Sequence, residues 1–237
     1  MKTVTSKDGT SIAFDQIGQG PALILVDGAM CYRASGPSGP LASLLAPHFT
    51  VYTYDRRGRG ASGDTTPYAI EREVEDIEVL INEVGGSAFV YGISSGAALA
   101  LEAAKRIPAI KKLALYEPPF IINDSRPPLP KDFIKQLKDA VAAGHRGDTI
   151  DIIMTQALQI PAQSLGPMRD DPMWPEMIKV AHTLVYDGLI QRDVMMGKPL
   201  PRDRWTSVNC PTLVLNGERC CWRIRTSGAT FFCTPLL

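Results

Sequence analysis

Apolar residues along the chain fall into short continuous runs that alternate with amphipathic segments. Four runs have the length and composition of strands buried on both faces of a sheet: "PALILV" (21–26), "TVYTY" (50–54), "AFVYG" (88–92) and "KLALY" (112–116). Residues 2–17 predict two further strands, because Asp8-Gly9 lies between them and suits a tight hairpin turn.

Helices are predicted between these strands. Apolar side chains between 70 and 84 recur at intervals of three and four, whereas acidic side chains fill the opposite face. Gly85-Gly86 would end this helix. Residues 95–106 predict another helix, and 41–45 a short one. Strands that alternate with helices in this way predict an α/β fold with a mostly parallel sheet and right-handed crossovers.

The alternation stops at "EPPFIINDSRPPLP" (117–130), where five prolines interrupt it. Helices are predicted near 131–143, 147–158 and 173–190, and a strand returns at 211–216. We therefore expect a core domain over 1–117, a helical cap insertion over 118–205 and the core resumed over 206–218. Six of the eight methionines lie in the cap insertion, where they suit either an irregular apolar ligand or a cap core.

Composition narrows the classes of function. The chain has 237 residues, with 25 Lys and Arg against 25 Asp and Glu, so no global field favours nucleic acid or an anionic membrane. Its first residues lack the pattern of a signal peptide, and no apolar run reaches the length of a membrane span, so we expect a cytoplasmic protein. The five cysteines have no metal-ligand spacing, and no metal or cofactor is expected.

Three motifs follow three of the predicted strands. Asp27-Gly28-Ala29-Met30 follows the first of them, and "DRRGRGAS" (55–62) follows the second. "VYGISSGAALA" (90–100) is a strand, a tight turn that carries Ser94, and an alanine-rich helix. Each motif alone is weak, but the three in this order form a strong pattern.

With these motifs, residues 1–217 resemble the α/β-hydrolase family, in its small esterase and haloperoxidase-like branch. The resemblance implies a sheet of eight strands with a helical cap after the sixth, and Ser94 as nucleophile at the tip of a nucleophile elbow. It also implies an oxyanion hole made by the backbone N–H groups of Ser95 and Ala29. Asp27 stands where the family usually has histidine. The implied reaction is cleavage of a small ester or amide through an acyl-enzyme.

The same resemblance implies a catalytic histidine well beyond the strand at 211–216. The sequence there is "ERCCWRIRTSGATFFCTPLL", whose composition changes at about Arg219 as if the reading frame had shifted. We expect 219–237 to be an atypical tail that lacks the family's last strand and helix. The strand at 211–216 would then be an exposed sheet edge, which favours self-association.

The base and the acid of the catalytic set must come from other positions. Of the three histidines, His48 is expected to be structural and His145 to be exposed, which leaves His182 as the candidate base. Cys220 occupies the usual position of the acid, so Glu117 is the first choice for the acid and Glu218 the second. We therefore expect an impaired hydrolase.

Two alternatives stay open. The first is a non-catalytic protein that binds a small ligand in the hydrolase pocket. The second is a nucleotide-binding oxidoreductase, because residues 58–63 read G-x-G-x-x-G. That fingerprint must open a helix, whereas "DTTPYA" (64–69) intervenes here. We accordingly expect Arg56, Arg57 and Arg59 to have structural roles.

Overall fold

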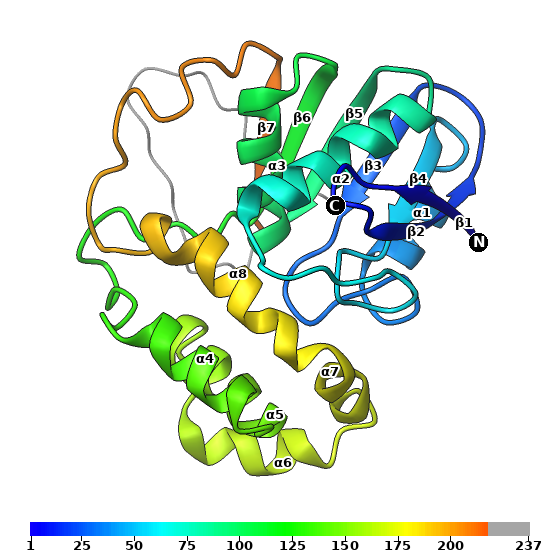
Figure 1. Ribbon diagram of the computed structural model, residues 1–237. Coiled ribbons are helices and arrows are strands. Elements are labelled where there is room, and N and C mark those ends of the chain that lie inside the picture. The colour runs from blue at the N-terminus through cyan, green and yellow to red at the C-terminus, as the bar shows by residue number, and fades with distance from the viewer. Residues whose placement is uncertain (218–237) are drawn as a thin grey trace.

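The computed structural model describes residues 1–217, which form a seven-stranded sheet with helices on both faces (Figure 1). The strand order is β1-β2-β4-β3-β5-β6-β7. β1 and β2 are antiparallel, β2 pairs antiparallel with β4, and every other pair is parallel. The strands are β1 (Lys2–Thr5), β2 (Ser11–Ile17), β3 (Ala22–Val26), β4 (Thr50–Tyr54), β5 (Ala88–Ile93), β6 (Ile110–Tyr116) and β7 (Thr212–Leu215). The mostly parallel sheet predicted from the sequence is confirmed.

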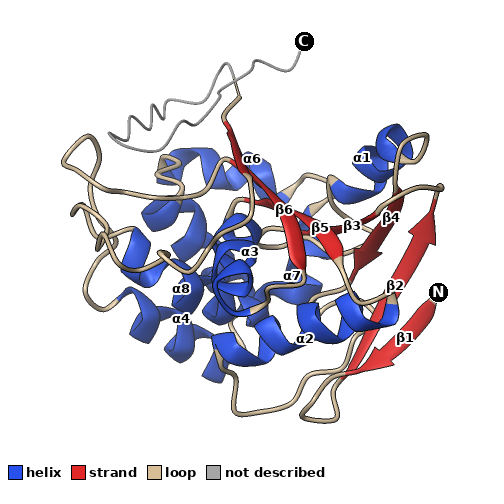
Figure 2. Ribbon diagram, turned by 90° about the horizontal axis from the view of Figure 1, so that it is seen from above, coloured by secondary structure: helices blue, strands red, loops and turns tan. Residues whose placement is uncertain are grey.

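Alternate side chains of the central strands enter two different apolar cores. Ile24 and Val26 of β3 pack in the core that also contains helices α2 (Ile70–Glu83) and α3 (Ser95–Arg106). Leu23 and Leu25 of the same strand pack instead with residues of α1 (Ser38–Leu45). This period of two explains why the strand reads as one continuous apolar run. Figure 2 shows α1 and the pair α2 and α3 on opposite sides of the sheet.

The helices between β6 and β7 form a layer of their own beside the sheet (Figure 1). They comprise α4 (Phe133–Ala142), α5 (Arg146–Ile152), α6 (Leu165–Arg169), α7 (Trp174–Val180) and α8 (Leu184–Gln191), and are called the cap helices below. Short helical turns connect them at Ile153–Ala157, Ala162–Ser164 and Ala181–Thr183, and another, Arg192–Val194, follows α8. Among the cap helices, α8 packs against α2 and α3 of the core.

The cap core decides between the two interpretations of the methionines. Met154 and Met195 are buried in it, and Met168 and Met177 pack against it. Only Met195 of the six also lines the cavity described below. Most of these side chains therefore fill the core of the cap.

The predicted helix over 173–190 is divided into α7, a 3₁₀ turn at Ala181–Thr183, and α8. The Thr183 hydroxyl donates to the Val180 carbonyl at 2.7 Å. A side-chain hydrogen bond of this kind competes with the regular helical pattern and is common where a helix tightens or bends. This local hydrogen bond accompanies a break that the apolar periodicity does not reveal.

Strand β7 lies at the edge of the sheet where the strand at 211–216 was predicted, and it is parallel to β6. Within residues 1–217 it is one of the two edge strands of the sheet, opposite β1, and Leu213 on it is partly exposed. The predicted atypical tail and Glu218 lie outside the described residues, and self-association through this edge stays a prediction. No helix in residues 1–217 is long and apolar enough to cross a membrane.

Candidate active site

Ser94 lies at a sharp turn between β5 and α3. Its backbone angles are φ 54° and ψ −123°, a region that a residue with a Cβ rarely adopts. The turn also needs the two glycines around it, since a Cβ at Gly92 would lie 2.7 Å from the Ala97 Cα and one at Gly96 would collide with the carbonyls of Val26 and Asp27. A strained serine at a strand-to-helix corner is the geometry of a nucleophile elbow.

A cavity of about 590 Å³ opens in front of Ser94. Its walls come from the turn after β3, the ends of β5 and β6, and the cap segments around Ile153 and Met195. The lining is mainly apolar, with Glu117, Arg126, Gln159, Gln191 and Asn216 among its polar members. A cavity of this size and character suits a small organic molecule.

Glu117 lines the same cavity, directly after β6. Its backbone also has a positive φ, 48°, and its N–H donates to the Leu215 carbonyl at 2.8 Å. The side-chain Oε1 accepts the Gly217 N–H at 3.0 Å. Ser94 and Glu117, which come from the ends of neighbouring strands, are therefore brought together in one cavity.

The turns that carry Ala29 and Ser95 lie against each other. A Cβ at Gly28 would be 3.2 Å from the Ser94 Cβ, a tight contact that glycine avoids. Ala29 lines the cavity, and Ser95 is the first residue of α3. The first N–H groups of a helix have no intrahelical acceptor and lie at the positive end of the helix dipole. The arrangement can therefore present N–H donors beside the Ser94 side chain.

Two other groups near this turn are not placed for catalysis. The Asp27 carboxyl is buried and accepts a hydrogen bond from the Ser38 hydroxyl at 2.7 Å, and burial raises its pKa. Cys31 lines the cavity, but burial raises the pKa of its thiol to about 11. Since the thiolate is the nucleophilic form, Cys31 is a poor competitor of Ser94 at neutral pH.

The three histidines of the chain all lie in the described residues, and none of them lines the Ser94 cavity. His182 lies half-buried in the turn between α7 and α8, and its Nδ1 has no hydrogen-bond partner within residues 1–217. Burial lowers the pKa of His182, and Arg146 lowers it further. His145 is exposed, as expected, whereas His48, which was expected to be structural, is exposed as well. The role of His182 as a base stays a prediction.

In the arginine-rich loop after β4 (residues 55–62), the arginines form buried ion pairs, as expected for a structural role. Arg56 forms two hydrogen bonds with Glu73, both at 2.7 Å, and Arg57 forms two with Asp76 at 2.7 and 2.8 Å. Arg59 pairs with Asp187 of α8 at 2.6 Å. All three guanidinium groups are buried. Sequence reasoning missed Asp187, although an acidic residue inside the apolar run "TLVYDGLI" was a signal for it.

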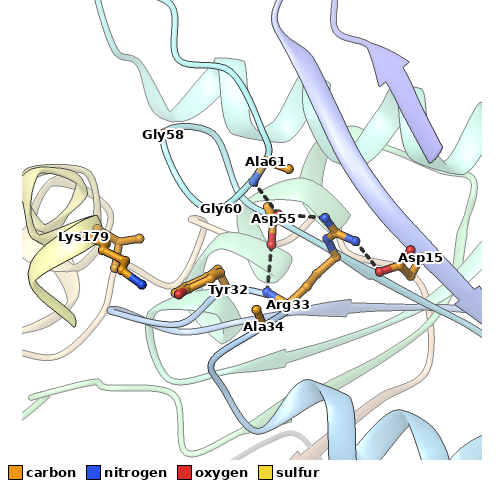
Figure 3. Close-up of a pocket in the computed structure, with 10 residues that line it drawn as sticks. Asp15, Tyr32, Arg33, Ala34, Asp55, Gly58, Gly60, Ala61 and Lys179 are labelled. Carbon is orange, nitrogen blue, oxygen red and sulfur yellow. Dashed lines mark hydrogen bonds and ion pairs between the residues drawn. The ribbon is translucent and has the colours of Figure 1, made fainter. Parts of the chain in front are cut away.

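The G-x-G-x-x-G segment does not form a phosphate-binding loop. The Asp55 carboxylate lies inside the loop, where it accepts the Ala61 N–H at 2.8 Å, and the next helix begins only at Ile70. The loop borders a second cavity of about 530 Å³, whose charged side chains include Arg33, paired with both Asp15 and Asp55 (Figure 3). Ser94 does not line this second cavity. The nucleotide-binding alternative therefore has no geometric support.

Metal chemistry also lacks a recognisable site in the described part of the chain. No group of three or more His, Cys, Asp or Glu side chains in residues 1–217 could hold a metal ion.

Comparison with known proteins agrees with the geometry of the elbow and sheet. Residues 23–229 match the sequence model of the Alpha/beta hydrolase family. The crystal structure of an alpha/beta hydrolase from Sphaerobacter thermophilus DSM 20745 superposes with a TM-score of 0.85 at 49% identity, over 92% of this chain and 83% of that one.

Two other relatives have names that specify a reaction. A pimeloyl-[acyl-carrier protein] methyl ester esterase of Xanthomonas campestris pv. campestris is 33% identical over 141 residues, 58% of this chain and 53% of the relative. The match thus spans about half the length of this curated relative. The enol-lactonase from Burkholderia xenovorans LB400 has a TM-score of 0.66 at 19% identity, over 92% of this chain and 81% of that one, a likeness in fold alone.

Proposed function

The chain belongs to the alpha/beta hydrolase family, and we propose on that premise that Ser94 is the nucleophile of a hydrolase for small esters or amides. The observation that carries the proposal is the strained backbone of Ser94, at φ 54°, in front of a cavity of about 590 Å³. Strain of this kind persists where the surrounding structure requires it, and it clusters at active sites.

In the proposed reaction, Ser94 Oγ attacks the acyl carbonyl and loses its proton to a base. The tetrahedral oxyanion accepts hydrogen bonds from the N–H groups of Ala29 and Ser95. Collapse of this intermediate transfers the acyl group to Ser94 and releases the alcohol or amine with a proton. Water then cleaves the acyl-serine ester, which frees the carboxylic acid and restores Ser94.

The reaction needs a base that accepts the Ser94 proton. Glu117 lines the cavity and is our proposed acidic member of the catalytic set, but no histidine in the chain lines that cavity. A serine hydroxyl without an imidazole beside it is a poor nucleophile. We therefore propose that this chain is an impaired hydrolase. Its rate of hydrolysis would be about 10³–10⁴-fold above that in water, sustained by the oxyanion hole and by substrate binding.

The cavity supports a small substrate with a mainly apolar acyl group. Its apolar walls favour such a group, and the side chains of Gln159, Gln191 and Asn216 offer a few polar contacts. The Xanthomonas relatives are methyl ester esterases, and an ester with a small alcohol group is the substrate class that we propose.

A second candidate function is binding of a small ligand without turnover. It is favoured by one observation, the absence of any of the three histidines from the cavity lining. In this case Ser94 would contribute to the shape of the pocket, but it would not become acylated. The same cavity and the same ligand class serve both candidates.

The deciding experiment is the intact mass of the folded chain after treatment with a fluorophosphonate. We expect one adduct that forms slowly, is lost in Ser94→Ala and is unaffected in Ser125→Ala, a second serine of the same cavity. An adduct that survives in Ser94→Ala would contradict the assignment of the nucleophile. A folded chain that never forms an adduct, yet is stabilised by a short-chain methyl ester, would establish the binding function instead.

A further inference from the structure

Asp187, on cap helix α8, contacts the elbow and the arginine-rich loop at once. It is fully buried, and its Oδ1 accepts hydrogen bonds from the Ser95 hydroxyl and from Arg56, each at 2.7 Å. Its Oδ2 accepts one from Arg59 at 2.6 Å. A single carboxylate from the cap thus reaches the residue that follows the proposed nucleophile.

Arg59 extends this contact to the turn after β3. Its Nη1 donates to the Gly28 carbonyl at 2.6 Å and to the Cys31 carbonyl at 3.1 Å. The Gly28 carbonyl and the Ala29 N–H belong to the same peptide unit, which is planar and trans. The N–H of such a unit points away from its carbonyl. The hydrogen bond from Arg59 to the Gly28 carbonyl therefore restrains the direction in which the Ala29 N–H points.

We propose that Asp187 is a positioning residue for the oxyanion hole. It orients one donor, the Ala29 N–H, through Arg59, and it orients the other, the Ser95 N–H, by binding the Ser95 hydroxyl. This inference rests on the proposed function, because the two N–H groups are oxyanion donors only if Ser94 is the nucleophile. Asp187 itself touches neither substrate nor reacting atom.

Opposite charges stabilise the contact of Asp187 with Arg59 and Arg56. Arg56 and Arg59 are balanced by Glu73 and Asp187, and all four side chains are buried. Burial alone would raise the pKa of Asp187, but Arg59 and Arg56 outweigh it and lower the pKa. Removal of one member of such a cluster leaves an uncompensated buried charge, so the remaining groups must move or take up water. Loss of the Asp187 charge should therefore displace Arg59 from Gly28.

A second cap contact supports this role. Arg59 Nε donates to the Thr183 hydroxyl at 3.1 Å, and Thr183 lies in the turn that leads into α8. The Arg59 guanidinium therefore binds the cap through Thr183 and Asp187, and it binds the turn after β3 through the Gly28 carbonyl. A displacement of α8 would be transmitted to the peptide unit that carries the Ala29 N–H.

The test compares Asp187→Asn with Asp76→Asn in the full chain. Asp76 is a matched control, since it is also buried and binds an arginine of the same loop, Arg57, but has no hydrogen bond with the elbow or with the turn after β3. The first readout is the ¹H–¹⁵N signal of the Ala29 amide in Ser94→Ala protein, which reports the hydrogen bond on the Gly28 carbonyl. We expect this signal to shift in Asp187→Asn and to stay in place in Asp76→Asn.

The second readout is the rate of fluorophosphonate labelling of folded protein that retains Ser94. We expect Asp187→Asn to lower the rate about 10–100-fold, somewhat less than the loss of an oxyanion donor, and Asp76→Asn to change it less than about twofold. If Asp187→Asn lowers the folded fraction, Arg59→Lys replaces it, because a single ammonium group cannot bind Asp187 and the Gly28 carbonyl in the same way.

The outcomes separate this inference from the proposed function. An unchanged Ala29 signal in Asp187→Asn, or equal effects of the Asp187 and Asp76 variants on the labelling rate, would overturn the positioning role. Failure of the unaltered chain to label would overturn the proposed function alone. The Ala29 signal would still decide whether Asp187 orients that peptide unit.

Discussion

The Asp187 carboxylate accepts a hydrogen bond from the Ser95 hydroxyl at 2.7 Å, although the two residues belong to different layers of the molecule. Asp187 lies in cap helix α8, and Ser95 is the first residue of the helix that follows the elbow. The bond connects the cap directly to the turn that carries Ser94. In this family member the cap is therefore part of the support of the candidate active site as well as a cover over its cavity.

The strain at Ser94 has a measurable cost. Ser94→Gly should raise the free energy of unfolding by about 1 kcal/mol relative to Ser94→Ala, because glycine adopts a positive φ without the steric penalty of a Cβ. Both variants lose the hydroxyl, so their difference isolates the backbone effect. Urea unfolding of the two variants measures it, and equal midpoints would show that the elbow is not strained.

Gly96 is required for the approach of α3 to β3. Gly96→Ala should destabilise the chain by more than about 3 kcal/mol, since the added Cβ collides with the backbone carbonyls of Val26 and Asp27. The matched control is Gly166→Ala in α6, where a Cβ meets no atom within 4 Å. That variant should gain up to about 1 kcal/mol from helix propensity. A similar thermal shift in both variants would contradict this account of the elbow.

The buried ion pair of Arg56 and Glu73 should contribute more to the free energy of unfolding than exposed ion pairs do. Glu73→Gln keeps the shape of the side chain but removes the charge that balances Arg56, and we expect a loss of about 3–5 kcal/mol. Asp139→Asn removes an exposed i,i+4 partner of Lys135 and should leave the free energy of unfolding almost unchanged. Denaturant unfolding checks both values, and a small effect of Glu73→Gln would show that the guanidinium is rehydrated easily.

His182 should make the stability of the chain depend on pH in the acidic range. Burial lowers its pKa below the ordinary value of 6.5, so the unfolded chain binds a proton more readily than the folded chain. Stability from this group is therefore complete above pH 6.5 and decreases as the pH falls below it.

The corresponding measurement follows the thermal midpoint of His182→Gln between pH 7.5 and 5. We expect the variant to lose less stability on acidification than the unaltered chain does. His145→Gln, at an exposed position, is the control and should follow the unaltered chain. If the His182 and His145 variants have the same pH profile, the half-buried imidazole does not contribute to acid sensitivity.

The local sequence pattern was sufficient to predict much of the fold. Continuous apolar runs predicted β3 to β6, and the repeat of Val74, Ile77 and Ile81 predicted α2 to within one residue of its end. The glycines around Ser94 indicated the elbow. These features depend on near neighbours in the chain, namely side-chain period, helix ends and turn conformation, so a linear reading can detect them.

The sequence by itself thus determined the family, the order of the elements and the turn that holds Ser94. Only the tertiary structure decided which charged side chains form pairs. The bond between Arg59 and Asp187 joins residues 128 positions apart, and no local pattern specifies such a partner. The same holds for His182, which was the candidate base from the sequence but does not line the Ser94 cavity. The physical reason is that buried charges and imidazoles take their partners from the packing of separate layers, which is settled only when the cap and the sheet come together.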